Sequence, residues 1–217
     1  MQQVLEQSSV GEVKDTLQAI AESLYDVYST ILKRIREQSP NRSNLAMRIL
    51  MWLSYSVRSL AVPELRHAEA IDVEASSLNP ERVPPARFIE DVCMDLLRID
   101  KEKKVLLADS SLKHYLIQLR ESLFPDGASH VAKSRLAYFN YSEFSNGPCK
   151  SEDAYQKRLE DYPFAVYVAQ YWGTHVEGWT KSDKIEIPNR IYNMFEDRQR
   201  LASFAQLMHV AENSKDY

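Results

Sequence analysis

Residues 97–108 read LRIDKEKKVLLA and decide the fold. Two short apolar runs, 97–100 and 104–108, flank the charged tripeptide 101–103. Apolar runs of strand length on either side of a polar turn are typical of a β-hairpin, and the rest of the sequence shows no second signal of this kind. The chain is therefore expected to contain one small hairpin in an otherwise helical protein.

The segment from Leu17 to Ile35 predicts a long helix upstream of the hairpin. Its apolar residues recur every three or four positions, which places them on one helical face. Asp15 or Thr16 is expected to cap the helix, because a short oxygen-bearing side chain accepts a bond from a free first-turn amide. The helix should end before Pro40, since proline disfavours helical geometry in the residue before it.

Three further helices are expected between this long helix and the hairpin. The first begins after Ser43, the second has Pro63 in its first turn, and the third begins near Ala86 after a Ser- and Pro-rich loop at 72–85. Three compact helices followed by a hairpin are the order of a winged helix, a variant of the helix-turn-helix.

The remainder of the chain predicts a C-terminal α-helical array. One helix resumes at Ser110, a break follows at 124–127, and the tripeptide 146–148 is a turn at which a subdomain joint is expected. Helical spacing of apolar residues returns in four segments, 129–144, 162–176, 185–195 and 201–210.

Aromatic residues dominate the predicted helix 162–176. Its stripe consists of Phe164, Tyr167, Val168, Tyr171 and Trp172. Rings at helical spacing could stack on bases, but they are more often core. We therefore expect Trp172→Ala to destabilise the chain strongly and the same change at Trp179, beyond the stripe, to do much less.

Composition excludes several classes of protein. The chain has 217 residues, 44% hydrophobic, with a net charge of −4 and only 5 glycines, none adjacent to another. Phosphate-binding loops need clustered glycines, so no nucleotide or other cofactor site is expected here. Two cysteines, Cys93 and Cys149, make no disulfide framework. Neither a membrane span nor a secretory signal is apparent, so a cytoplasmic location and no membrane partner are expected.

The sequence offers no convincing catalytic or metal site. Asp109, Ser110 and His114 are close enough to suggest a hydrolytic triad, but Asp109 or Ser110 is better explained as a helix cap. A zinc site needs converging ligands, and no two histidines lie three or four residues apart. These histidines are His67, His114, His130, His175 and His209. Catalytic, cofactor-binding and metal-binding residues are all expected to be none, and the chain is not expected to be an enzyme.

DNA binding is the alternative function, because winged helices often place their third helix in the major groove. That helix, 86–97, carries three acids, which repel phosphate. They are Glu90, Asp91 and Asp95, beside Arg87. The segment 33–66 has seven basic and two acidic residues (+5), whereas 143–186 has five basic and eight acidic residues (−3). We expect these surfaces to face each other or a neighbouring domain rather than nucleic acid.

Six segments in order resemble the region that follows the NACHT nucleotide-binding domain in fungal NOD-like receptors, a region often labelled the GPI inositol-deacylase winged-helix domain. They are 24–32, 46–53, 58–65, 93–97, 109–116 and 162–172, and the resemblance covers roughly residues 16–177. The sequence departs from the family pattern at Asp109, where His is usual, and at Ser59, where Pro is usual.

The resemblance implies a division of the chain and a function. It implies a flexible lead-in at 1–14, a linking helix at 15–42 that follows a NACHT-like domain, a winged-helix domain at 43–122 and a helical domain at 128–217. The implied role is that of a non-catalytic regulatory module. Such a module packs on the NACHT NTPase domain and couples it to C-terminal ankyrin or WD40 repeats in signalling. The alternative is a winged-helix DNA-binding transcriptional regulator.

Overall fold

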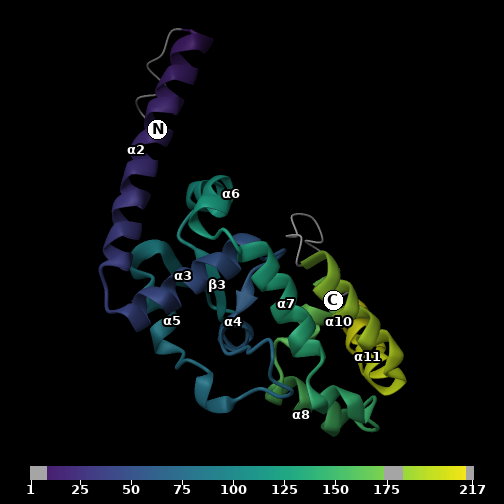
Figure 1. The fold of residues 1–217 in the computed structure, drawn as a ribbon. Helices are drawn as coiled ribbons and strands as arrows, with labels where there is room; N and C mark the ends of the chain where they lie inside the picture. Colours follow the sequence, from purple (N-terminus) through teal and green to yellow (C-terminus); the bar gives the residue numbers. More distant parts are fainter. Residues whose placement is uncertain (1–8, 174–182, 214–217) are drawn as a thin grey trace.

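The computed structural model describes residues 9–173 and 183–213, and it confirms a mainly α fold with a winged-helix unit and a C-terminal helical array. Figure 1 shows a body formed by the winged helix on one side and the array on the other. One long helix, α2, projects from this body at its N-terminal end (Figure 1).

Helix α2 spans Val10–Arg36 and begins earlier than its sequence pattern predicts. Ser9, rather than Asp15 or Thr16, is the cap. The Ser9 hydroxyl accepts a bond from the amide of Glu12 (3.2 Å), and the Glu12 carboxylate accepts one from the amide of Ser9 (2.9 Å). This reciprocal capping box satisfies two free amides and starts the helix upstream of its first buried residue. The expected lead-in is therefore helical from Val10 onward.

The winged helix follows the order helix, strand, helix, helix, hairpin. Its elements are α3 (Pro40–Tyr55), β1 (Leu60–Ala61), α4 (Val62–Glu69), α5 (Arg87–Val92), β2 (Leu97–Ile99) and β3 (Lys104–Leu107), with short 3-10 turns at Pro80–Arg82 and Met94–Leu96. As expected, Pro63 lies in the first turn of α4, whereas α3 begins at Pro40 and not after Ser43.

The predicted hairpin is confirmed, but it is part of a three-stranded antiparallel sheet of order β1-β3-β2. Val105 of β3 pairs with Leu60 on one side and with Ile99 on the other. Two residues are too few to show strand alternation, which is why β1 has no sequence signal. In the turn, the Asp100 carboxylate accepts bonds from the amides of Glu102 (2.9 Å) and Lys104 (2.8 Å).

Helix α6 (Ser110–Leu123) follows the sheet and completes the winged-helix unit. The array begins after α6 and consists of short helices packed around aromatic side chains. Its elements are α7 (Gly127–Phe139), the 3-10 helix η3 (Ser142–Asn146), α8 (Glu152–Asp161), α9 (Ala165–Tyr171), α10 (Asp183–Glu196) and α11 (Arg198–Asn213). Three differences from the sequence analysis stand out. Helix α7 ends at Phe139, α8 was not predicted, and α9 begins only at Ala165.

The expected joint at 146–148 is a turn inside the array. Gly147 has φ +85°, a left-handed conformation that glycine adopts without strain. The amide of Cys149 donates to Gln206 of α11 (2.8 Å), and Arg158 of α8 donates to the carbonyl of Gly147 (2.9 Å). Two later helices, α8 and α11, therefore hold this turn within the array.

The winged helix and the array share one continuous core. Trp52 of α3 is fully buried and meets the ring of Phe164 edge-on, with 5.5 Å between ring centroids. The hydroxyl of Tyr167 in α9 accepts a bond from the amide of Val57 (3.1 Å), just after α3. The guanidinium of Arg58 lies 4.9 Å from the centroid of the Tyr167 ring. These contacts fix the position of the array against α3.

Candidate functional site

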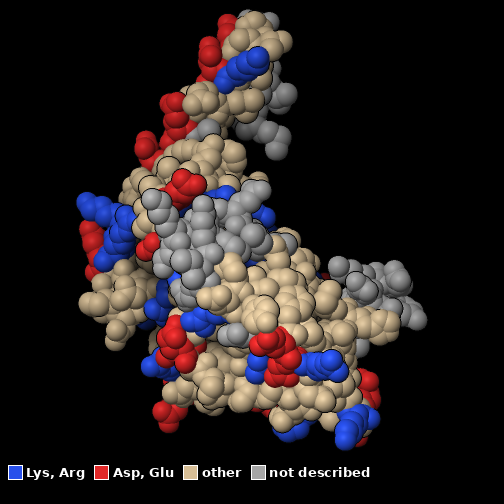
Figure 2. Space-filling view, turned by 45° about the vertical axis from the view of Figure 1, so that its right-hand side comes forward, with Lys and Arg blue, Asp and Glu red and all other residues tan. Residues whose placement is uncertain are grey.

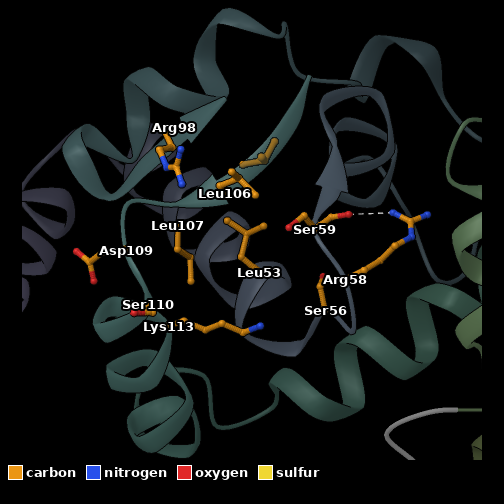
Figure 3. A pocket seen from close by; sticks show the side chains of 11 residues that line it. Leu53, Ser56, Arg58, Ser59, Arg98, Leu106, Leu107, Asp109, Ser110 and Lys113 are labelled. Carbon is orange, nitrogen blue, oxygen red and sulfur yellow. Dashed lines mark hydrogen bonds between the residues drawn. The ribbon is translucent and has the colours of Figure 1, made fainter. Parts of the chain in front are cut away.

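A pocket of about 230 Å³ lies where the sheet meets the ends of two helices. Figure 3 shows its walls, formed by the end of α3, the chain that enters β1, strands β2 and β3, and the start of α6. Leu53 and Leu107 form an apolar floor between Arg98 and Lys113 (Figure 3). The pocket thus combines an apolar floor with a cationic rim.

Arg58 and Glu64 make one wall of this pocket rigid. Both carboxylate oxygens of Glu64 accept bonds from Arg58, at 2.7 and 2.8 Å, and one of them also accepts from the amide of Ala61 (2.7 Å). Burial of the guanidinium lowers the pKa of Arg58, but the hydrogen bonds and charge of Glu64 outweigh this effect, and the net shift is upward. Arg58 therefore stays charged, and Glu64 already occupies its guanidinium.

Asp109 makes the opposite wall and confirms its predicted role as a helix cap. Its carboxylate accepts bonds from the amide of Leu112 (2.8 Å) and from the hydroxyls of Ser111 (2.6 Å) and Tyr28 (2.9 Å). Burial raises the pKa of Asp109, and these hydrogen bonds more than offset that, so the net pKa is lowered. The carboxylate is saturated by α6 and α2.

The imagined triad of Asp109, Ser110 and His114 is not assembled. The Nε2 atom of His114 lies 2.8 Å from Nε2 of Gln118, one turn further along α6. The oxygens of Asp109 contact Tyr28 and Ser111 rather than an imidazole. In the described part of the chain, neither Asp109 nor His114 is therefore placed as a base for the Ser110 hydroxyl.

Arg98 and Lys113 are the cations of the pocket that remain available. Both side chains are exposed, and neither makes an ion pair with any residue in the ranges 9–173 and 183–213. They come from β2 and α6 and lie on opposite sides of the apolar floor (Figure 3). Such a rim suits a carboxylate side chain presented by another protein surface. No sequence pattern joins these two residues, since only the sheet brings them together.

A second cavity, of about 370 Å³, is lined in part by a buried carboxylate, Glu69 at the end of α4. The Glu69 side chain is 0% exposed, and its Oε2 accepts a bond from Nε of Arg48 (2.8 Å). Its Oε1 and the indole Nε1 of Trp52 have no hydrogen-bond partner in the described part of the chain. Burial raises the pKa of Glu69 to about 7, against the opposing effect of Arg48. Glu69 follows Leu65 by one helical turn, a spacing that could have flagged it as inward-facing.

The histidines are dispersed. His67 lies 3.1 Å from the hydroxyl of Tyr138, and burial lowers its pKa to about 4. His130 packs edge-on against Trp52, and burial lowers its pKa as well. His175 lies outside the described residues. Within those residues, no group of three His, Cys, Asp or Glu side chains is close enough to hold a metal ion.

Both cysteines carry free thiols. Cys93 is buried beneath α3, where burial strongly raises the pKa of its thiol. Cys149 is half-buried beside α8 and α11, as its bonds to Ala154 and Gln206 show. A buried thiol with a raised pKa is unreactive. The structure thus gives Cys93 a packing role.

The helix that would enter a DNA groove is short and internally engaged. It spans only Arg87–Val92, and two of its acids already have partners. The carboxylate of Glu90 accepts a bond from the amide of Ile99 in the wing (3.0 Å), and Asp91 pairs with Arg42 (2.8 Å). These acids fasten the helix to β2 and α3.

Several basic residues of segment 33–66 are paired within the winged helix itself rather than with the acidic segment 143–186, which was one of the two partners expected for this surface, the other being a neighbouring domain. Arg48 pairs with Glu69 and Arg58 with Glu64, while Arg66 donates to the carbonyl of Pro84 (2.6 Å). Figure 2 accordingly shows basic and acidic side chains interspersed over the body. Because α3, α4 and the segment between them pack together, these pairs bring opposite charges close and neutralise part of the basic excess.

The aromatic stripe is core over its first part only. Phe164, Tyr167 and Val168 are buried, as expected, but Tyr171 and Trp172 are only half-buried. Helix α9 ends at Tyr171, and the last ring, Trp172, packs at the edge of the core while staying partly exposed. Trp172 meets the exposed ring of Phe195 at the surface, with 6.0 Å between centroids. A half-buried ring at this place does not support the strong destabilisation that was expected for Trp172→Ala. Trp179 lies outside the described residues.

The order of elements and the wing define a winged-helix domain, and the comparison with protein families agrees. Residues 32–128 match the family model described as GPI inositol-deacylase, winged helix domain, which is a NACHT-associated domain. The match runs from the buried part of α2 to the start of α7 and includes the pocket of Figure 3. No curated protein and no solved structure matched the chain. No helix within the described ranges is long and apolar enough to cross a lipid bilayer.

Proposed function

We propose that this chain is a non-catalytic regulatory module of a fungal NOD-like receptor, which packs on a NACHT nucleotide-binding domain and couples it to ankyrin or WD40 repeats. The match of residues 32–128 to a NACHT-associated winged helix is the observation that carries this proposal. We attach no chemistry to the word deacylase in the family description, because the Asp109 carboxylate is bonded to Tyr28 and Leu112 and the His114 ring lies against Gln118.

The pocket of Figure 3 is the surface that we assign to the partner domain. Its free cations, Arg98 and Lys113, suit an acidic side chain of that domain, and its leucine floor provides apolar contact. The rigid wall formed by Arg58 and Glu64 keeps the pocket open without a partner. This arrangement supports docking rather than catalysis.

Binding to a recombinant NACHT domain tests the proposal. The chain is titrated into that domain by calorimetry while ATP hydrolysis by the domain is followed. We expect saturable binding in the micromolar range and a change in hydrolysis rate. Replacing both Arg98 and Lys113 by Glu should weaken binding at least tenfold. Lys101→Glu, at the exposed hairpin tip, is the matched control and should bind normally. Absence of binding at about 100 μM would contradict the proposal.

DNA binding is the other outcome to test. The engaged acids Glu90 and Asp91 predict no sequence-dependent binding in a fluorescence-anisotropy titration at physiological salt. Saturable, sequence-dependent binding near 10⁻⁸ M, the range of specific sites, would favour the transcriptional regulator instead.

A further inference from the structure

The N-terminal half of α2 carries an apolar seam of which, in the part of the chain that the structure describes, only Leu24 packs against the core. The seam alternates steps of three and four residues, the heptad spacing of a coiled coil. It consists of Val10, Val13, Leu17, Ile20, Leu24 and Val27. Val10 is 74%, Leu17 51% and Val27 50% exposed. Figure 1 shows this half of α2 standing clear of the body.

The two halves of α2 differ in what they contact. The C-terminal half buries Tyr28, Leu32 and Ile35 against the winged helix. The seam continues the same helical face past the edge of the body: Leu24 still packs against the core, and the half of α2 that precedes it stands clear of the body. A regular apolar seam exposed over this length is typical of a surface that pairs with another helix.

The charges along α2 favour a second copy of this chain as the occupant. The acids Glu12, Asp15, Glu22 and Asp26 all lie off the seam, and Figure 2 shows acidic side chains gathered along one edge of the projecting helix. The positions beside the seam include Thr16 and Ser23, which are small and uncharged. Two copies can therefore approach without bringing like charges together.

We infer that two copies pair antiparallel through this seam. An antiparallel pair places Leu17 opposite the partner's Ile20, Val13 opposite the partner's Leu24, and Val10 opposite the partner's Val27. In heptad notation, Val10, Leu17 and Leu24 are a positions and Val13, Ile20 and Val27 are d positions. Every layer therefore joins an a position of one helix to a d position of the other. The two helix dipoles oppose each other, and the two bodies lie at opposite ends of the pair.

The area of this seam sets the expected strength of the pair. A fully buried Val or Leu side chain removes roughly 100 Å² from water. Six positions per helix, already partly shielded, then bury about 600–1,200 Å² in total, the range of weak and transient interfaces. We therefore expect a reversible dimer with a dissociation constant in the micromolar range. This pairing does not depend on the proposed NACHT partner.

Sedimentation equilibrium of the whole chain over a range of concentrations tests the pairing. The wild type should shift from monomer to dimer, and Leu17→Glu or Ile20→Glu should weaken the dimer at least a hundredfold. Ala19→Glu places the same charge on the outer, exposed face and is the matched control. Circular dichroism melting should show all variants folded, because these side chains project from the body. A monomer at every concentration, or a dimer that Leu17→Glu leaves intact, would overturn the proposal.

Cross-linking tests the orientation. In a Cys149→Ser background, which leaves only the buried Cys93, Val10→Cys and Val27→Cys chains are mixed and oxidised. The antiparallel pair predicts disulfides between the two variants and few between identical chains. Efficient Val10→Cys homodimers would indicate a parallel pair and overturn the inferred arrangement.

Discussion

The winged helix and the helical array are held together by different kinds of core. In the winged helix, buried positions are mostly aliphatic, as Ile49, Leu50, Leu65, Ile89, Val92 and Leu116 illustrate. In the array about half of them are aromatic, among them Tyr138, Phe139, Tyr141, Phe144, Phe164, Tyr167 and Phe204. Aliphatic side chains are short and contact only close neighbours, so a core built from them needs closely packed, regular helices. Large aromatic rings span wider gaps, so they fill the space between short and irregular segments.

The two cores meet at Trp52, which belongs to the winged helix but packs against the array. Its ring contacts His130 of α7 and Phe164 just before α9. Next to it, Tyr167 binds the amide of Val57 and lies between the guanidinium groups of Arg58 and Arg135. The predictions below ask whether this contact makes one folding unit of two dissimilar regions.

Trp52→Ala should have the largest effect. Trp52 is 0% exposed, and truncating a buried Trp typically costs about 3–5 kcal/mol. Because its ring touches both regions, the loss should lower the melting temperature of both together. Urea unfolding followed by far-ultraviolet circular dichroism measures this loss. A change below about 1 kcal/mol would mean that the two cores are independent of this ring.

Glu69→Gln should stabilise the chain at alkaline pH. The folded protein holds the Glu69 proton up to about pH 7, whereas the unfolded chain releases it near 4.5, so rising pH removes stability across this window. Gln keeps the side chain's shape and avoids the buried charge. At about pH 8 the variant should gain on the order of 2–3 kcal/mol over the wild type, and little at about pH 4.5. Equal stability changes at both values of pH would contradict a buried, proton-binding Glu69.

His67 opposes Glu69 in the same pH range. Its folded pKa is lowered from 6.5 to about 4, so stability is lost as pH falls through this window. His130, with a lowered pKa, acts in the same direction. Wild-type stability should therefore vary little between about pH 4.5 and 6.5, and Glu69→Gln should reveal a clear rise with pH. Urea midpoints across this range measure it.

Tyr167→Phe should have a smaller effect and should weaken the joint between the regions. The variant keeps the ring but leaves the amide of Val57 and a donor of Arg135 without the phenol oxygen. Losing one partner of a part-buried hydrogen bond costs about 1–3 kcal/mol. Tyr192→Phe, on an exposed ring of α10, is the control and should change unfolding by less than about 0.5 kcal/mol. If the two changes lowered the free energy of unfolding equally, the Tyr167 hydroxyl would not contribute to the contact between the winged helix and the array.

Trp172→Ala should have the smallest effect of the four substitutions. The ring is half-buried and contacts the exposed Phe195 at the edge of the array. We expect a loss of about 1 kcal/mol, several-fold below that of Trp52→Ala, in the same urea experiment. A loss as large as that of Trp52→Ala would place the joint at the end of α9 instead.

The different cores also explain how much of the fold the sequence predicts. The hairpin 97–107, the proline start of α4 and the Asp109 cap follow from local chemistry and are confirmed. Helix α8 was missed because it buries a single ring, Tyr155, and otherwise shows a polar surface. A helix with one buried residue has no periodicity to detect.

The candidate sites depend on tertiary structure to a greater degree. Arg98 and Lys113 belong to different elements, and nothing in their sequence neighbourhoods joins them. Glu69 is buried because α4 turns it toward Arg48 and Trp52, although its charge predicts exposure. The pairing of segment 33–66 within its own unit was likewise unpredictable, since the partners follow from how α3, α4 and α5 pack.

Native-state hydrogen exchange with increasing denaturant tests most directly whether the two regions form one unit. Amides of α3 and α6 in the winged helix, and of α7 and α9 in the array, should converge on the same opening free energy and the same denaturant dependence. Trp52→Ala should lower the opening free energy of all four helices equally. If the array exchanged through a separate, lower-energy opening while α3 and α6 stayed protected, the shared core would be contradicted.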